Sequence, residues 1–419
     1  MPQLSIIVTS YNIESYIEQC LDSIVGQTLH DIEIIVVDDG SSDSTPEIVE
    51  RYASADDRIV PVLLGVNSVG GVATAANAGL DRATSPYVGF ADGDDFYEPE
   101  MFEKLLDAAT RHDSDLAICQ YKLFNDDTDE LSDPAELSRW TGLGHEAFPL
   151  DTETSKQFLR FIAVPWRKIY RRQMLEDNSI RFPVGDYFYE DNPFHWFSVL
   201  SSASLAVVPE VLCYHRVARQ GQTMDTADER LFRIFLHHDT INAWLVERQL
   251  ETMFGPTLLA WAISQMEWIA PRTPKALRRQ LFGILQGIYS QYDPQTVDLA
   301  LLEGKKGAKA RQLSTAVQAG NLANFNKALD ARAKSSNPVV TAAYHLRYSG
   351  LSHTARLTKR YTTERLVSSS GPFGRRWRAR SELTNSDLMF ALMVIQTRLE
   401  SIDRRLADLE SSSQLRSTQ

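Results

Sequence analysis

The first 125 residues alternate short apolar, β-branched runs with segments of helical periodicity. We predict strands at residues 4–10, 33–39, 59–64, 87–92 and 115–121. Between them, apolar residues such as Ile17, Leu21 and Ile24 recur at helical spacing, and Pro46 directly follows a helix-start signal. The strands are apolar on both faces and alternate with helices. We therefore predict an α/β fold with a doubly wound, mainly parallel sheet.

The rest of the chain divides into segments of different character. After an irregular stretch at 126–165, predicted strands at 164–172 and 205–217 flank a loop and helix at 180–200. The predicted domains are an α/β domain at 1–225, an all-α helical domain at 226–350, a basic linker at 351–384 and a short coiled coil at 385–412.

The predicted coiled coil depends on a narrow apolar stripe near the end of the sequence. Its members alternate at spacings of four and three residues: Leu388, Leu392, Ile395, Leu399, Ile402, Leu406 and Leu409. A lone helix would leave this stripe in water, so a partner helix is expected. We predict a homo-oligomer held by 385–412, with docking onto the chain's own α/β domain as the alternative.

Charge and cysteine content exclude several classes of protein. Residues 1–270 carry 44 Asp and Glu against 19 Lys and Arg, within an overall net charge of −12. The excess negative charge of residues 1–270 would repel phosphate groups, which disfavours nucleic-acid binding. The three cysteines are far apart, which fits a reducing compartment better than a disulfide framework. With no secretory signal and no clean membrane span, we expect a cytoplasmic protein.

Two acidic clusters follow predicted strands, at 38–40 (DDG) and 92–95 (DGDD). Parallel sheets bind ligands at the carboxyl ends of their strands. The first strand leads into TSYNIES, which lacks the GxGxxG fingerprint, so dinucleotide binding is disfavoured. Three carboxylates in one turn repel one another unless a cation or ligand compensates, and Mg²⁺ or Mn²⁺ suits oxygen ligands. Solvated turns with helix-capping aspartates remain the alternative for both clusters.

These features together resemble the family 2 glycosyltransferases of the GT-A fold, over residues 3–225. Seven segments carry the resemblance: LSIIVTSYN (4–12), IVVDDGSSDST (35–45), GVATAANAGL (71–80), YVGFADGDDFYEPE (87–100), WRKIYRR (166–172), FPVGDYFYEDNPF (182–194) and CYHRVARQGQTM (213–224). One segment departs from the family pattern, because Ala76 stands beside Asn77 where many relatives carry Arg. That departure puts the donor's identity in doubt more than the catalysis.

The resemblance implies roles for the residues that would bind the donor. Thr9 and Tyr11 would flank the nucleotide base, and Asp39 would accept the N3–H of uracil. Asp92 would bind the ribose side. Asp94 would hold the metal that bridges the diphosphate, while Asp95 gives structural or acceptor-side support.

The remaining roles fall in the later segments. Asp191 looks like the catalytic base, and Glu190 beside it could raise the pKa of that base or contact the acceptor. Arg216 and Arg219, with His215, fall where the family closes a loop over the diphosphate. His215 is also predicted as a metal ligand, together with Asp94.

The resemblance implies an inverting, metal-dependent glycosyltransferase. It would move a sugar from a nucleotide-sugar, with UDP as the expected nucleotide, to a glycan or lipid-linked acceptor in bacterial surface polysaccharide synthesis. A non-catalytic nucleotide-sugar scaffold and a nucleotidyltransferase are the alternatives. The basic stretch at 375–380 could contact an anionic membrane, or could be a solvated linker.

Several conspicuous residues are interpreted as packing rather than site residues. His195 follows the Glu190–Asp191 pair on a predicted helix and is assigned to the core. Trp261 and Trp268 lie seven residues apart on one helical face, which is typical of core packing. Trp166 fits either a buried strand position or a sugar-stacking surface.

Overall fold

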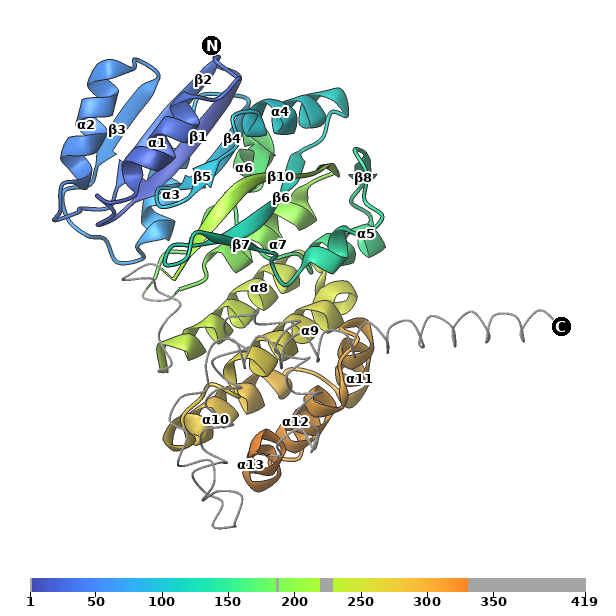
Figure 1. The fold of residues 1–419 in the computed structure, drawn as a ribbon. Helices are drawn as coiled ribbons and strands as arrows, with labels where there is room; N and C mark the ends of the chain where they lie inside the picture. Colours follow the sequence, from blue (N-terminus) through green and yellow to red (C-terminus); the bar gives the residue numbers. More distant parts are fainter. Residues whose placement is uncertain (1, 186–187, 219–228, 331–419) are drawn as a thin grey trace, which may run out of the picture. The chain divides into compact units, whose positions relative to one another are not determined.

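A mixed sheet of ten strands lies at the centre of the computed structural model, which describes residues 2–185, 188–218 and 229–330 (Figure 1). The strand order is β3-β2-β1-β4-β9-β6-β10-β5, with β7 beside β6 and β8 beside β10. The strands are β1 Leu4–Ser10, β2 Ile32–Asp38, β3 Ile59–Leu63, β4 Tyr87–Asp92, β5 Phe96–Tyr97, β6 Leu116–Asn125, β7 Glu130–Ser132, β8 Ala147–Pro149, β9 Lys168–Arg171 and β10 Ser204–Val217. The helices are α1 Ile17–Val25, α2 Thr45–Ala55, α3 Val72–Leu80, α4 Met101–Arg111, α5 Thr152–Phe158, α6 Arg172–Asp177, α7 Asp191–Ser201, α8 Leu236–Glu247, α9 Glu251–Ile269, α10 Arg278–Tyr289, α11 Pro294–Glu303, α12 Ala308–Gln318 and α13 Leu322–Asp330.

The described chain through Asp330 belongs to one compact unit. The predicted basic linker at 351–384 and coiled coil at 385–412 lie outside the described residues, and the oligomer and membrane contact that depend on them stay predictions.

The first half of the sheet is parallel, as the sequence predicts. β1 pairs in parallel with both β2 and β4, and β2 pairs in parallel with β3. Each of these strands is joined to the next by a helix, which is the connection that parallel pairing requires. The predicted strand boundaries agree with the structure to within one residue here.

The second half departs from a purely parallel sheet. β9 lies between β4 and β6 and is antiparallel to both, whereas β6 and β10 are parallel to each other. A short apolar run has the same pattern in either direction, so the sequence predicted this strand but not its orientation. β10 also carries irregularities between Val208 and Cys213, around Pro209, where a proline is compatible with a bulged strand.

Helices cover both faces of the sheet. Alternate residues of β1 point to opposite sides, so Ile6 packs in one apolar cluster with α1 and α4, and Ile7 packs in the other with α3 and α7. Ile241 of α8 and Leu258 of α9 belong to that second cluster too. The first helices of the helical region therefore share a core with the sheet.

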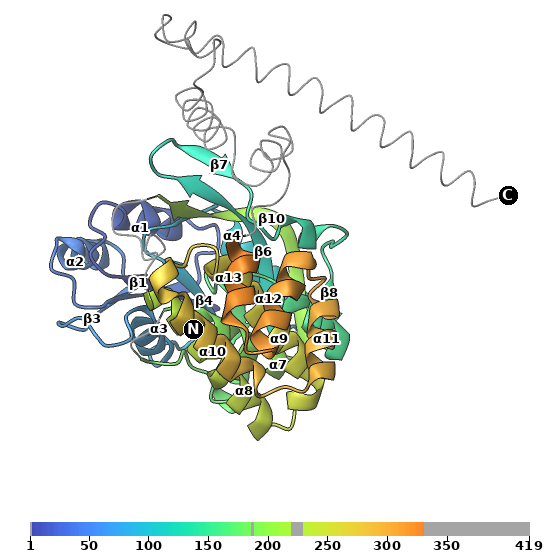
Figure 2. The same ribbon diagram turned by 90° about the horizontal axis from the view of Figure 1, so that it is seen from below.

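The remaining helices pack mainly on one another. α9 contacts α11 and α12, and α10 contacts α12 and α13, around a third apolar cluster (Figure 2). In the described chain the predicted helical domain begins with a 3₁₀ helix, Glu229–Phe235, which leads directly into α8. Among the described residues, no helix combines the length and apolarity needed to cross a bilayer.

Candidate active site

Three of the predicted nucleotide-binding residues lie at the carboxyl ends of adjacent parallel strands. Thr9 of β1 pairs with Asp92 of β4 on one side and with Val37 of β2 on the other. Asp39 directly follows β2, and its backbone N–H donates to the Ser10 carbonyl at 2.9 Å. Asp38 and Asp92 are 54 residues apart in the sequence. Pairing through β1 nevertheless brings the two acidic clusters to one edge of the sheet.

The two adjacent aspartates after β2 have different surroundings. Asp38 accepts hydrogen bonds from the N–H and hydroxyl of Ser41, at 2.9 and 2.5 Å, and so caps the turn. Asp39 accepts from the backbone N–H of Ser68 at 3.2 Å. Burial raises the pKa of Asp39, and the Ser68 hydrogen bonds oppose that rise. The turn-and-cap interpretation therefore fits Asp38 better than Asp39.

The loops that follow β1 and β2 are hydrogen-bonded to each other. The Asn12 N–H donates to the Ser41 hydroxyl, and the Asn12 side-chain oxygen accepts from the Ser42 N–H, both at 2.8 Å. The Ser44 N–H donates to the Glu14 carboxylate at 2.8 Å. Tyr11, the predicted base-flanking residue, extends from this pair of loops and is 47% exposed.

The acidic turn after β4 is fixed by close backbone packing. The Gly93 N–H donates to the Thr9 carbonyl at 3.0 Å, and the Asp92 N–H donates to the Tyr97 hydroxyl at 2.9 Å. A Cβ atom on Gly93 would lie 2.8 Å from the Thr9 carbonyl oxygen and 2.6 Å from a methyl group of Ile13. Only glycine lets the turn approach β1 this closely.

Gly93→Ala should therefore destabilise the protein by about 1–3 kcal/mol, the usual cost of overpacking a core site. Urea unfolding measures the change. Gly283→Ala is the matched control, because an added Cβ there meets nothing within 4 Å and Gly283 lies inside α10. The control should be more stable than wild type, since alanine is the better helix former. Equal stability of wild type and Gly93→Ala would contradict the packing described here.

Asp95, which is buried, and His215, which is partly buried, form an ion pair at the acidic turn. The carboxylate of Asp95 lies 2.9 Å from Nδ1 of His215 on β10, and it accepts the backbone N–H of Arg216 at 2.8 Å. Burial lowers the pKa of His215, but the charge and hydrogen bond of Asp95 outweigh burial and raise it to about 9. The ring of His215 stacks on Trp166, which is buried. Trp166 is thus a core residue rather than an exposed sugar platform.

The structure brings three potential metal ligands together. Donor atoms of Asp92, Asp95 and His215 lie within 4.8 Å of one another. Burial and the neighbouring carboxylates raise the pKa of Asp92 well above its ordinary value, so negative charge here is under-compensated. Carboxylates suit Mn²⁺ or Mg²⁺, so Asp92 and Asp95 fit a divalent cation. His215 would have to lose the proton that Asp95 stabilises before it could be a ligand. The predicted ligand Asp94 lies in the same turn but outside this set of three.

Arg216 holds the acidic turn to its surroundings. Its guanidinium donates to the Asp94 carbonyl at 2.8 Å and to the side chain of Gln19 at 2.5 Å, and it forms an ion pair with Asp126. The contact of Arg216 with a diphosphate stays a prediction. Arg219, the second predicted clamp residue, lies outside the described residues.

The predicted base lies at the start of α7. Asp191 is the first helical residue and Glu190 precedes it. Burial raises the pKa of Asp191 to about 6, against the opposing charge of Lys168, and burial raises the pKa of Glu190 to about 7. The charge of Asp191 also contributes to the raised pKa of Asp92, so the two carboxylates lie within electrostatic reach.

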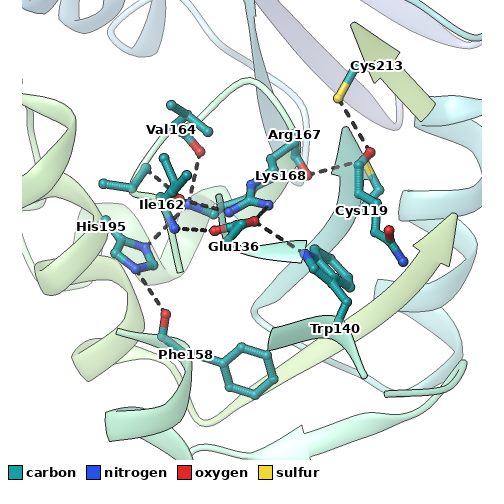
Figure 3. Close-up of polar contacts among 12 residues, drawn as sticks. Cys119, Glu136, Trp140, Phe158, Ile162, Val164, Arg167, Lys168, His195 and Cys213 are labelled. Atoms are coloured by element: carbon teal, nitrogen blue, oxygen red, sulfur yellow. Dashed lines mark hydrogen bonds and ion pairs between the residues drawn. The ribbon is translucent and has the colours of Figure 1, made fainter. Parts of the chain in front are cut away.

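Lys168 belongs to a buried polar network beneath α7 (Figure 3). Its ammonium donates to the carbonyls of Ala163 and Val164, at 3.0 and 2.9 Å, and lies 3.3 Å from Nδ1 of His195. Nε2 of His195 lies 3.2 Å from the Phe158 carbonyl, so the ring donates there and accepts from Lys168. Burial lowers the pKa of Lys168 well below its ordinary value. His195 is core, as the sequence predicts, and it positions Lys168.

Sequence reasoning missed two hydrogen-bonding residues. Asn192 donates its side-chain N–H to Asp191 at 2.9 Å, and its oxygen accepts from the indole N–H of Trp261 at 3.0 Å. Asn77, noted only beside Ala76, exchanges two hydrogen bonds with the backbone of Phe182. No signal in the sequence pointed to either residue, because Trp261 and Phe182 lie in segments far from Asn192 and Asn77.

Comparisons with known proteins give one consistent result. The model of "Glycosyl transferase family 2" matches residues 5–178. The chain is 33% identical over 306 residues to the uncharacterized glycosyltransferase EpsJ of Bacillus subtilis (strain 168), covering 68% of this chain and 84% of EpsJ. It is also 33% identical over 220 residues to the putative glycosyltransferase EpsH of that strain, of which it spans only 61%.

Similarity extends to a poly(ribitol-phosphate) glycosyltransferase and to its solved structure. The chain is 30% identical over 229 residues to the Poly(ribitol-phosphate) beta-N-acetylglucosaminyltransferase TarS of Staphylococcus aureus (strain Mu50 / ATCC 700699), covering 54% of this chain and 38% of TarS. The crystal structure of S. aureus TarS 1–349 in complex with UDP-GlcNAc has a TM-score of 0.64 at 23% identity. It covers 78% of this chain and 90% of that one, which shows a shared fold. The family match and the long alignment with EpsJ show that this chain belongs to glycosyltransferase family 2 and is a glycosyltransferase of the GT-A fold.

Proposed function

We propose that this enzyme transfers a sugar from a UDP-sugar to a hydroxyl group of a glycan or lipid-linked acceptor, with inversion at the anomeric carbon. One observation carries the proposal: Asp39 and Asp92 share a sheet edge, and α7, which begins at Asp191, packs on β4 through the rings of Phe194 and Phe90. The predicted nucleotide-binding edge is thereby combined with the proposed base, whose pKa is raised by burial. Named relatives include a Poly(ribitol-phosphate) beta-glucosyltransferase, which supports a surface-polymer acceptor.

The chemistry assigned to the chain's own residues follows from their positions. Thr9 and Asp39 would hold the nucleotide base and orient the donor. The carboxylate of Asp191 would accept the proton of the acceptor hydroxyl. At the same time the oxygen of that hydroxyl would bond to the anomeric carbon. The bond from that carbon to the diphosphate breaks as the new bond forms, and UDP leaves with the electron pair. One base and no enzyme nucleophile give inversion, as in inverting carboxylate enzymes.

Asp92, Asp95 and His215 would hold a divalent cation, with Asp94 as the fourth candidate. When bound, the cation supplies positive charge against the diphosphate. Arg216 would keep the turn in place through its hydrogen bond to the Asp94 carbonyl.

The deciding experiment measures UDP release from UDP-glucose, UDP-galactose and their N-acetyl forms, with glycan acceptors, in Mn²⁺, in Mg²⁺ and in EDTA. We expect release with one donor, dependent on the metal. UDP binding by thermal shift without release from any donor would instead support the non-catalytic scaffold. Release of pyrophosphate from UTP and a sugar phosphate would support a nucleotidyltransferase.

The pH dependence of kcat follows from the base. Asp191 works only as the carboxylate, and its pKa is about 6. Activity should therefore be nearly constant above pH 7 and fall about tenfold per pH unit below about pH 6. A kcat profile measured from pH 5 to 8 checks this. A profile that stays flat down to pH 5 would contradict the assignment of Asp191 as the base.

We also propose, from the sequence outside the described residues, that 385–412 holds subunits together and that the protein works in the cytoplasm at the membrane face. Light scattering of the full chain and of a chain ending at Asn385 tests the first. Flotation with neutral and anionic vesicles tests the second.

A further inference from the structure

Three contacts from the helical region converge on the segment that leads into α7. Nε2 of His237 on α8 lies 2.7 Å from the Phe188 carbonyl. The ring of Trp268 on α9 meets the Tyr189 ring edge-on, with centroids 6.1 Å apart. The indole N–H of Trp261, also on α9, donates to the side-chain oxygen of Asn192 at 3.0 Å. Two helices outside the sheet thus contact three of the five residues from 188 to 192.

The contact from Trp261 determines the orientation of the Asn192 amide. An indole N–H is only a donor, so it requires the oxygen of Asn192 to face α9. The amide nitrogen must then point the other way. It donates to the Tyr189 carbonyl at 3.0 Å and to the Asp191 carboxylate at 2.9 Å. Trp261 on one side and the Tyr189 carbonyl on the other therefore favour the same amide orientation, in which Asp191 faces a hydrogen-bond donor and not a repelling oxygen.

We propose that Trp261 is a positioning residue for the catalytic base, acting through Asn192 to hold the Asp191 carboxylate in its reactive orientation. This inference rests on the proposed function, because it matters only if Asp191 is the base. It assigns a role to the helical region in the reaction itself. Core packing, the role predicted from the sequence, is then only part of what Trp261 does.

Other charged groups also face Asp191 and must stay unchanged in a test. Lys168 on β9 and Asp92 on β4 act on it through their charges, and Glu190 is its neighbour on the chain. Among the described residues, the indole N–H of Trp261 donates to Asn192 and forms no hydrogen bond with any of these three groups. A change at Trp261 should thus reach Asp191 through the amide.

Trp261→Phe removes the indole N–H and keeps an aromatic ring. We expect kcat to fall about fivefold or more, as for the loss of one hydrogen bond of about 1 kcal/mol, with KM for the UDP-sugar unchanged. The midpoint of the kcat–pH profile should move upward, because a freed amide no longer stabilises the charged carboxylate. Both are measured by UDP release from the most rapidly used of the four donors.

Trp268→Phe is the matched control. It removes an indole N–H from the same helix, and its ring can still meet Tyr189. We expect wild-type kcat and pH profile. Equal losses in the two variants would assign Trp261 a packing role and overturn the proposal.

A double-mutant cycle with Asn192→Ala tests the route. If Trp261 acts through Asn192, Trp261→Phe should have no further effect in the Asn192→Ala background. Full additivity, or a Trp261→Phe enzyme with wild-type kcat and pH profile, would overturn the inference while the proposed function stands. If Asp191→Asn keeps its activity, the proposed base is wrong instead, so the two failures are distinguishable.

Discussion

Asp191→Asn should lose sugar transfer by about 10²–10⁴-fold while it still binds the UDP-sugar. Asparagine nearly conserves the shape of the side chain. Its amide, however, is not basic enough to accept the proton of the acceptor hydroxyl. The substituted residue starts α7, and its surroundings already favour a neutral group, because burial raises the pKa of Asp191. The fold should therefore tolerate the change. Single-turnover transfer and donor binding by calorimetry give the two quantities.

Asp298→Asn is the matched control for this variant. Asp298 is exposed on α11, so the same chemical change there should leave kcat and donor affinity as in wild type. An Asp191→Asn enzyme that keeps more than about a tenth of the wild-type rate would remove Asp191 from the mechanism, given the usual size of base catalysis.

Asp92→Asn should remove the Mn²⁺-dependent part of UDP binding, a loss of roughly 100-fold or about 2.7 kcal/mol. Asp92 is one of three residues whose donor atoms lie within 4.8 Å of one another, and an amide is a weaker ligand for a hard cation than a carboxylate. Asp94→Ala should have a similar effect if the role implied by the family resemblance holds. Titration calorimetry with UDP in Mn²⁺ and in EDTA separates the metal-dependent part.

Asp57→Asn, on an exposed turn before β3, controls for the loss of one negative charge and should bind UDP as wild type does. An equal loss of affinity in Mn²⁺ and in EDTA would assign Asp92 to the ribose alone. Unchanged metal-dependent binding in both Asp92→Asn and Asp94→Ala would place the cation elsewhere.

The parallel half of the fold could be predicted from the sequence because its information is local. Each strand from β1 to β4 is a mostly apolar run rich in β-branched residues, and a segment of helical periodicity separates each strand from the next. The strand-end positions of Asp39 and Asp92 follow from the same pattern. Parallel pairing then places them at one edge without knowledge of any distant contact.

The parts that could not be predicted depend on segments far apart in the chain. Asp95 was assigned only a supporting role, because nothing local shows that His215 reaches it across 120 positions. Trp261 looked like a core residue because apolar periodicity says nothing about where an indole N–H points. The direction of β9 was missed for a related reason, since strand orientation is decided by neighbours and not by the run itself.

The paired loops after β1 and β2 have a consequence for the energetics of binding. Asn12 and Glu14 are held to Ser41, Ser42 and Ser44 by hydrogen bonds made entirely within the protein. Ordering a loop on binding costs conformational entropy, which is subtracted from affinity. Here that cost is met when the protein folds, so a nucleotide keeps more of its interaction energy as affinity. Substitution of Asn12 would then weaken nucleotide binding by loosening the site, with every predicted base-binding side chain still in place.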